Sequence, residues 1–138
     1  GDSASIPEAQ PAGATSADIG NHVVHFSAQT TDQLPPAIAR EYNILRSKNR
    51  AMLNVSVLRS SDNKPVTADV TVNTVNLTGQ LKNVTMRKIE EPGDVVAIYY
   101  IGDTTIANRE VLNFDISVRP DGVEDVSRVR FQRQFYSD

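Results

Sequence analysis

Apolar and polar residues alternate along most of the chain after residue 21, and this alternation predicts β-strands that each place one face on a core. In residues 66–72, every even-numbered position is apolar and every odd-numbered position is polar. After Val72 the apolar positions move to Val75 and Leu77, and this one-residue shift predicts a β-bulge. Other runs of this kind lie at residues 23–28, 53–57, 81–89, 112–118 and 129–135.

One further run, residues 95–101, is apolar on both faces, as expected of a central strand that is covered on both sides. Turn-forming residues separate the runs at residues 61–65, 91–94 and 120–122. About seven short strands with tight turns predict an all-β, antiparallel, immunoglobulin-like β-sandwich. An antiparallel meander barrel is the alternative.

Residues 34–42 break the alternation. Two prolines begin the segment, good helix formers follow, and Ile38 and Tyr42 are four residues apart. This pattern predicts one short helix between the first two strands. We expect the helix to plug an open end of the sandwich.

Composition narrows the class of protein. A chain of 138 residues suits one hydrophobic core, and the absence of cysteine excludes disulfide scaffolds, zinc fingers, iron–sulfur clusters and thiol catalysis. Residues 1–20 contain three acidic and no basic residues, so the remaining chain has 14 of each and is neutral. A neutral body argues against nucleic acid as a partner. No apolar run approaches the roughly 20 residues of a membrane-spanning helix, so we expect no membrane insertion.

Residues 1–20 are rich in Ala, Ser, Pro and Gly and nearly lack bulky apolar side chains. Such a segment cannot offset the entropy of ordering, so we predict a flexible, disordered tether at 1–20 and a single β domain at 21–138. Similar tethers follow the cleavage sites of exported bacterial proteins. We therefore expect a periplasmic or otherwise exported protein, either free or anchored by lipid on an N-terminal cysteine that this sequence lacks.

The sequence shows no motif for chemistry. His22 and His25 are three residues apart in an extended run, which puts them on opposite faces and prevents a shared metal. No nucleophile elbow, zinc-binding helix motif, phosphate loop or dinucleotide fingerprint is present. We therefore assign no catalytic, cofactor or metal residues, and expect a protein that is not an enzyme.

The strongest polar candidate is a basic loop before the strand at residues 53–57. Its cations could receive a carboxylate or phosphate, because arginine forks suit planar oxyanions. The simpler interpretation is a solvated loop whose arginines pair with Glu90, Glu91 or Asp94. Tyr99 and Tyr100 point to opposite faces of their strand, so one tyrosine can be a surface contact. The candidate interaction residues are Arg46, Lys48, Asn49, Arg50 and Tyr100.

Four segments together carry a family resemblance: residues 21–28 (NHVVHFSA), 44–58 (ILRSKNRAMLNVSVL), 98–101 (IYYI) and 130–138 (RFQRQFYSD). With these segments the chain resembles the proteobacterial family catalogued as domain of unknown function 4426, over nearly all of the sequence after the tether. The resemblance implies a small exported bacterial β-domain. It implies no activity, and no catalytic residue is carried over.

Two classes of function remain. The first is a non-catalytic periplasmic binding or protein-interaction module that holds an unknown protein or envelope component. The second is a small-ligand binder or enzyme with a pocket near the short helix. A concave pocket with polar groups from several strands would favour the second class, and a flat, exposed apolar patch would favour the first.

Overall fold

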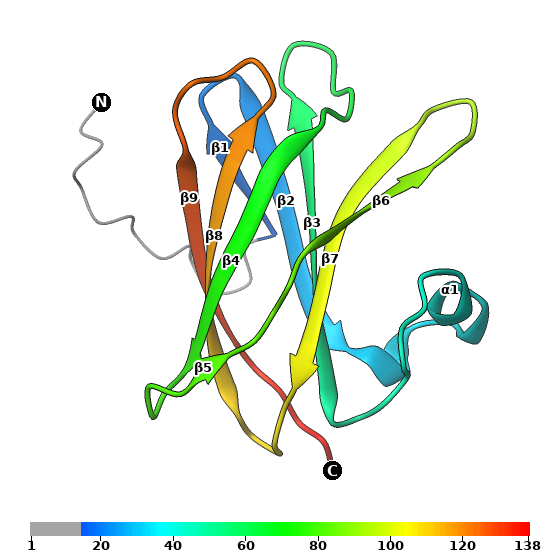
Figure 1. Ribbon diagram of the computed structural model, residues 1–138, viewed down its shortest axis with the longest axis vertical. Helices are drawn as coiled ribbons and strands as arrows, with labels where there is room; N and C mark the ends of the chain where they lie inside the picture. Colours follow the sequence, from blue (N-terminus) through cyan, green and yellow to red (C-terminus); the bar gives the residue numbers. More distant parts are fainter. Residues whose placement is uncertain (1–14) are drawn as a thin grey trace.

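The computed structural model describes residues 15–138, which form two antiparallel sheets packed face to face (Figure 1). This arrangement confirms the predicted β-sandwich, and the described strands form two separate sheets and no closed barrel. In spatial order, the five-stranded sheet contains β1 (Ser16–Ile19), β2 (His22–Thr30), β3 (Arg50–Arg59), β7 (Ala97–Thr105) and β6 (Arg87–Glu91). The four-stranded sheet contains β5 (Leu81–Lys82), β4 (Ala68–Asn76), β8 (Val111–Pro120) and β9 (Ser127–Gln134).

The described residues contain nine strands, two more than the alternation predicted. Strand β1 lies inside the predicted tether, so the boundary at residue 20 is wrong. Ala17 and Ile19 pack against the core, and Gly20, at φ +73°, allows the tight turn into β2. The first part of that tether, residues 1–14, lies outside the described residues. The predicted run at 81–89 divides into β5 and β6, which belong to different sheets.

The bulge expected after Val72 does not form. Strand β4 pairs with β8 in one unbroken register along its whole length, from Ala68 to Asn76. Thr74 continues the inward-facing phase and is 1% exposed. Because threonine has the shape of valine, it fits an inward-facing strand position among apolar residues. Its polarity is the reason that the alternation in the sequence did not show this position as inward-facing. Leu77, which suggested the shift, is exposed in the turn after β4.

Aromatic rings join the two sheets at the centre of the core. The Phe114 and Phe131 ring centroids are 4.8 Å apart, and Phe131 lies 4.7 Å from Phe26 of the opposite sheet. All three side chains are buried, together with inward-facing residues of β3, β8 and β9. The alternation therefore predicted the inward faces of these strands correctly.

Helix α1 (Pro36–Glu41), which follows the 3-10 turn η1 (Thr31–Gln33), does not plug an end of the sandwich. Ala39 and Ile44 instead pack with Met52 and Ile101 on the outer face of the five-stranded sheet. The reason is that β3 and β7 carry apolar residues on both faces and need cover outside as well. This confirms the prediction of a doubly covered strand, although β7 begins at Ala97. No helix within residues 15–138 has the length and hydropathy needed to cross a membrane.

The chain crosses from one sheet to the other at residues 83–86, between β5 and β6 (Figure 1). This crossing passes closely over Gly102 of β7. A Cβ atom at Gly102 would lie only 2.7 Å from the Thr85 carbonyl oxygen and 2.9 Å from the Met86 sulfur. Glycine is therefore required for the approach. The crossing closes the side of the sandwich on which β5 and β6 lie.

Candidate functional site

Two arginines of the basic loop at residues 46–50 contact the rest of the fold. The Arg46 Nε donates to the Leu34 carbonyl at 2.8 Å, and its Nη2 donates to the Asp32 carbonyl at 2.7 Å. Arg50 Nε forms an ion pair with Asp103 Oδ2, also at 2.8 Å. These contacts fasten the loop to the turn before α1 and to β7, so two of its three cations are already engaged.

The acidic partners proposed for this loop were wrong. Asp103 takes the role expected of Glu90, Glu91 or Asp94, because Arg50 and Asp103 lie on neighbouring strands β3 and β7. Glu90 instead pairs with Lys88 at 3.2 Å, and Glu91 accepts a hydrogen bond from the Tyr42 hydroxyl.

Lys48 and Asn49 are exposed in the same loop. The backbone N–H of Asn49 donates to Ser47 Oγ at 3.0 Å, and its carbonyl accepts a hydrogen bond from the Ile106 N–H at 2.8 Å. An interaction role for Lys48 and Asn49 stays a prediction.

Tyr100 is a core residue and not the surface contact that the sequence suggested. It is 6% exposed, and its hydroxyl oxygen accepts a hydrogen bond from the Ala68 N–H at 2.8 Å. Tyr100 lies on β7 and Ala68 on β4, so this bond joins the two sheets. Its neighbour Tyr99 faces outward and packs against the cluster under α1.

The two histidines lie as predicted, on opposite faces of β2. His22 is 8% exposed, whereas His25 is exposed to solvent. Within residues 15–138, no three or more His, Asp or Glu side chains come together as a metal site would require.

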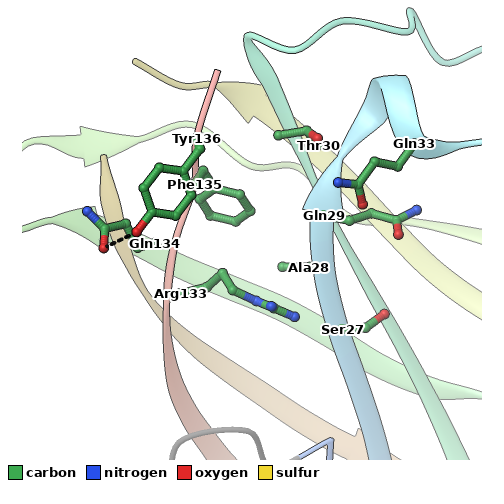
Figure 2. Close-up of a pocket in the computed structure, with 9 residues that line it drawn as sticks. All are labelled: Ser27, Ala28, Gln29, Thr30, Gln33, Arg133, Gln134, Phe135 and Tyr136. Atoms are coloured by element: carbon green, nitrogen blue, oxygen red, sulfur yellow. Dashed lines mark hydrogen bonds between the residues drawn. The ribbon is translucent and has the colours of Figure 1, made fainter. Parts of the chain in front are cut away.

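A cavity of about 290 Å³ opens on the other side of the sandwich, between β2 and the end of β9 (Figure 2). We call it the edge groove. It collects side chains from β2, from the turn η1 and from the last residues of the chain. The lining residues are Ser27, Ala28, Gln29, Thr30, Gln33, Arg133, Gln134, Phe135 and Tyr136.

The groove faces the edges of two strands. Four consecutive residues of β2 line it, as do the last two residues of β9 and the two residues that follow it. Because successive side chains of a strand point to opposite faces, a cavity that touches all four must lie beside the backbone. Among the described residues, β1 covers β2 only as far as the bond from the Phe26 N–H to the Thr15 carbonyl. Strand β9 is itself the edge of its sheet.

Backbone hydrogen-bonding groups point into the groove from both walls. In an antiparallel ladder, the N–H and C=O of one residue face one neighbour and those of the next residue face the other. Phe26 bonds toward β1, so Ala28 and Thr30 direct their backbone groups to the same side. Phe135 donates to Glu110 next to β8, so Gln134, the last residue of β9, directs its backbone groups away from β8 and toward the groove.

Arg133 supplies the charge of the groove. It follows Val129 and Phe131 in the inward-facing phase of β9, yet it is exposed. Figure 2 shows its side chain extending across the cavity toward β2. Among residues 15–138 its guanidinium has no hydrogen bond or ion pair, and no Asp or Glu lines the groove. An arginine in this state can bind a carboxylate through two parallel hydrogen bonds.

The rest of the groove combines an apolar floor with amide groups. Ala28 and Phe135 are each 4% exposed and form the floor. Gln29 and Gln33 present free amides among the described residues, whereas Gln134 is held by the Tyr136 hydroxyl at 3.0 Å and donates to the Arg109 carbonyl. The arrangement suits a ligand with polar and apolar parts.

The sequence held one signal for this site that the alternation missed. Residues 129, 131 and 135 are apolar and face inward, and Arg133 interrupts that series. An arginine in an apolar phase marks either a strand end or a functional position.

The sequence also suggested a pocket near the short helix. The cavity touches Gln33 in the turn before α1 and does not touch α1, so the position expected for that pocket was only approximate.

The fold and the groove together define a class of protein: an antiparallel β-sandwich domain with a polar groove between two sheet edges. A family model for a domain of unknown function, DUF4426, matches residues 16–138, and the chain belongs to this family.

Among solved structures, a crystal structure of a DUF4426 family protein from Pseudomonas aeruginosa PAO1 is similar, with 30% sequence identity and a TM-score of 0.76. That match covers 89% of this chain and 94% of the Pseudomonas chain. A family 123 glycoside hydrolase from Clostridium perfringens matches with 10% identity and a TM-score of 0.40, over 81% of this chain and 27% of the hydrolase. A likeness that weak supports no shared activity. No match was found among curated proteins.

Proposed function

We propose that this domain is a non-catalytic binding module of the bacterial envelope and that the edge groove is its binding site. The observation that carries the proposal is Arg133, an unpaired cation among the described residues, set in a cavity with polar groups from two strands and a turn. By the criterion set from the sequence, a concave site with polar groups from several elements favours the second class, a ligand binder or enzyme with a pocket. The side chains that line the groove decide between these two, and they favour a binder. Outside the groove, the large exposed apolar residues of the described chain fall in four separate places: Leu45, Leu77 with Leu81, Val95 with Val96, and Val126.

The residues around the groove suit binding better than catalysis. General acid–base chemistry needs a titratable group near neutral pH or a pair of carboxylates at a fixed separation. Among residues 15–138, the lining of the groove includes no Asp, Glu, His, Lys or Cys, and Ser27 has no base beside it there. What the lining offers is hydrogen-bond donors and one positive charge.

Site-specific photocrosslinking in the native bacterium tests the site. A photoreactive benzoylphenylalanine in place of Gln33 or Tyr136 lines the groove, and the same residue at Thr71 lies on the exposed outer face of the other sheet. We expect one defined adduct from the two groove positions and none from Thr71. Arg133→Ala should abolish the adduct. Equal adducts at all three positions, or adducts indifferent to Arg133, would contradict the proposal.

We also propose that the protein is exported to the periplasm, free or lipid-anchored. The support is the composition of residues 1–20, which is typical of the segment behind an export cleavage site. The full-length gene product, tagged at its C-terminus, should be released when cells are converted to spheroplasts. If it stays with the spheroplast membranes and partitions into detergent, a lipid anchor is indicated. Retention in the cytosolic fraction with a cytosolic marker would overturn export.

A further inference from the structure

We infer that the edge groove binds an extended acidic segment of a partner protein as an added β-strand, which pairs with the backbone of β2 and places a carboxylate on Arg133. This inference rests on the proposed function, because it names the ligand class of the same site. It follows from three properties of the groove: the direction of its backbone groups, its apolar floor and its charge.

The backbone of β2 provides the pairing surface. Ala28 and Thr30 direct their N–H and C=O groups toward the groove, beyond the point where β1 stops pairing among the described residues. Exposed edge groups of this kind accept an additional strand, and main-chain hydrogen bonds then supply affinity. Residues 27–30 span roughly 13 Å at about 3.3 Å per residue, which is enough to pair with a segment of four or five residues.

The side chains of the groove give the added strand its pattern. Ala28 and Phe135 form a buried apolar floor, so a strand residue that faces inward should be apolar. Arg133 stands on the opposite wall and reaches toward β2, where it would meet the strand. A guanidinium that lacks an acidic partner in the described chain selects Asp or Glu at the facing position. The ligand is therefore an extended segment that combines apolar residues with a carboxylate.

Charge also favours a partner protein over a second copy of this chain. Two copies that paired β2 with β2 about a twofold axis would each bring an Arg133 to the shared edge. Like charges close together at an interface are unfavourable. A second copy and residues 1–14 of the same chain are the other conceivable occupants, and the experiment below detects each of them.

The test uses the full chain and a displayed library of random heptapeptides as the probe. We expect enriched peptides to contain Asp or Glu between apolar or β-branched residues. Affinity for a synthesised consensus peptide should fall at least tenfold with Arg133→Ala and stay within twofold with Arg119→Ala. Arg119 is a control on another strand, because its side chain on β8 is 42% exposed and already paired with Asp69. Enrichment without acidic residues, or affinity unchanged by Arg133→Ala, would overturn the inference.

Amide hydrogen exchange followed by NMR then identifies strand pairing. The peptide should slow exchange at Ala28 and Thr30 and leave Ser27 and Gln29 unchanged, because the latter two already bond toward β3. Binding without this alternate protection would mean side-chain capture only, which contradicts the added strand. Protection before any peptide is added would identify a second copy if it depends on protein concentration, and residues 1–14 if it does not. Either result overturns the partner strand.

The two proposals can fail separately. If acidic peptides do not bind but the photocrosslinked adduct at Gln33 persists, the groove is a binding site for another class of ligand. If both the peptide and the adduct are absent, the groove is not the binding site.

Discussion

The two sides of this sandwich differ in what lies between the edges of the two sheets. On one side, which we call the closed side, the chain crosses from β5 to β6 at residues 83–86 and passes over Gly102 of β7. The Tyr100 hydroxyl bonds to Ala68 of the opposite sheet, and Lys82 pairs with Glu110 at 3.2 Å. On the other side, within residues 15–138, the edges of β2 and β9 face each other across the edge groove.

The two sides also differ in whether their polar groups have hydrogen-bond or ion-pair partners. On the closed side, every polar group named above has a partner within the chain. On the open side, Arg133 and the backbone groups of Ala28 and Thr30 have none among the described residues. Proteins normally block or pair exposed strand edges, because unpaired edges recruit other strands. The proposed binding function rests on this edge, which is open among residues 15–138, and on the arginine beside it. Five predictions measure that contrast.

The largest loss of stability should follow Glu110→Ala, on the closed side. Glu110 accepts hydrogen bonds from Asn76 Nδ2 and the Ala107 N–H, each at 2.9 Å, and pairs with Lys82. The Lys82 and Glu110 side chains are only 10% and 11% exposed. Removing the Glu110 carboxylate leaves the largely buried Lys82 ammonium without its ion partner. This should lower the free energy of unfolding by about 3 kcal/mol. Urea denaturation at pH 7 measures the loss, and a cost below about 1 kcal/mol would mean that the pair is effectively solvated.

The pKa of the Glu110 carboxyl predicts that the closed side loses stability in acid. Burial opposes ionisation of Glu110, but hydrogen bonds from Asn76, Ala107 and Lys82 outweigh burial and hold its pKa below the ordinary value. A lowered folded-state pKa contributes stability that is complete above the unfolded-state pKa, about 4.3, and disappears as pH falls through the folded value. The native protein should lose this stability below about pH 4.3. The Glu110→Gln variant has no carboxyl at this position, so its stability should not show the part of the acid-induced loss that Glu110 causes.

Gly102→Ala should have the next largest effect. The added Cβ would meet the Thr85 carbonyl at 2.7 Å, so the crossing or β7 must shift, at a cost of about 2 kcal/mol. Gly93→Ala is the control, because its nearest neighbour would lie at an ordinary 3.6 Å. Denaturation midpoints of both variants give the comparison. Equal midpoints would show that the crossing is loosely held and that the closed side is less closed than its contacts indicate.

How far the sequence predicts this molecule depends on whether a feature is local. The inward faces of β3 and β8 follow from two-residue alternation, which each strand carries by itself. Strand β1 escaped prediction because its four residues become a strand only by pairing with β2, in a stretch whose composition resembles a tether. The position of α1 was wrong for a similar reason. Met52 and Ile101 signalled a second apolar face, but only the sheet order puts them side by side.

The candidate site depends even more on non-local structure. The basic loop at 46–50 is conspicuous in sequence, yet Arg46 and Arg50 are engaged by groups that are distant along the chain. Arg133 is inconspicuous among the neighbouring arginines of β9, and it is singled out only because it faces the part of β2 that is unpaired within the described chain. Which edges remain unpaired is decided by strand order, which alternation does not encode. A polar residue in an apolar phase was the one local sign of the site.

Tyr100→Phe should produce a smaller loss on the closed side. The change removes the hydroxyl that accepts the Ala68 N–H and leaves that donor without its partner, at a cost of about 1 kcal/mol. Tyr99→Phe is the matched control, because the Tyr99 hydroxyl has no hydrogen bond within residues 15–138. Urea denaturation of the two variants separates them. If Tyr100→Phe is as stable as its control, the bond between the sheets contributes nothing to the closed side.

The smallest effect should come from the open side, with Arg133→Ala. An exposed side chain with no partner among the described residues contributes little to the free energy of unfolding, so we expect a change within about 0.5 kcal/mol of the native protein. Urea denaturation at pH 7 measures this change, with Arg119→Ala as the control. A loss above about 1 kcal/mol would mean that Arg133 is engaged by the chain itself, because only a folded-state partner converts an exposed charge into stability. The groove would then be completed from within the protein, and its arginine would not be free for a partner. A near-zero change leaves Arg133 available for a partner, as the proposed function requires.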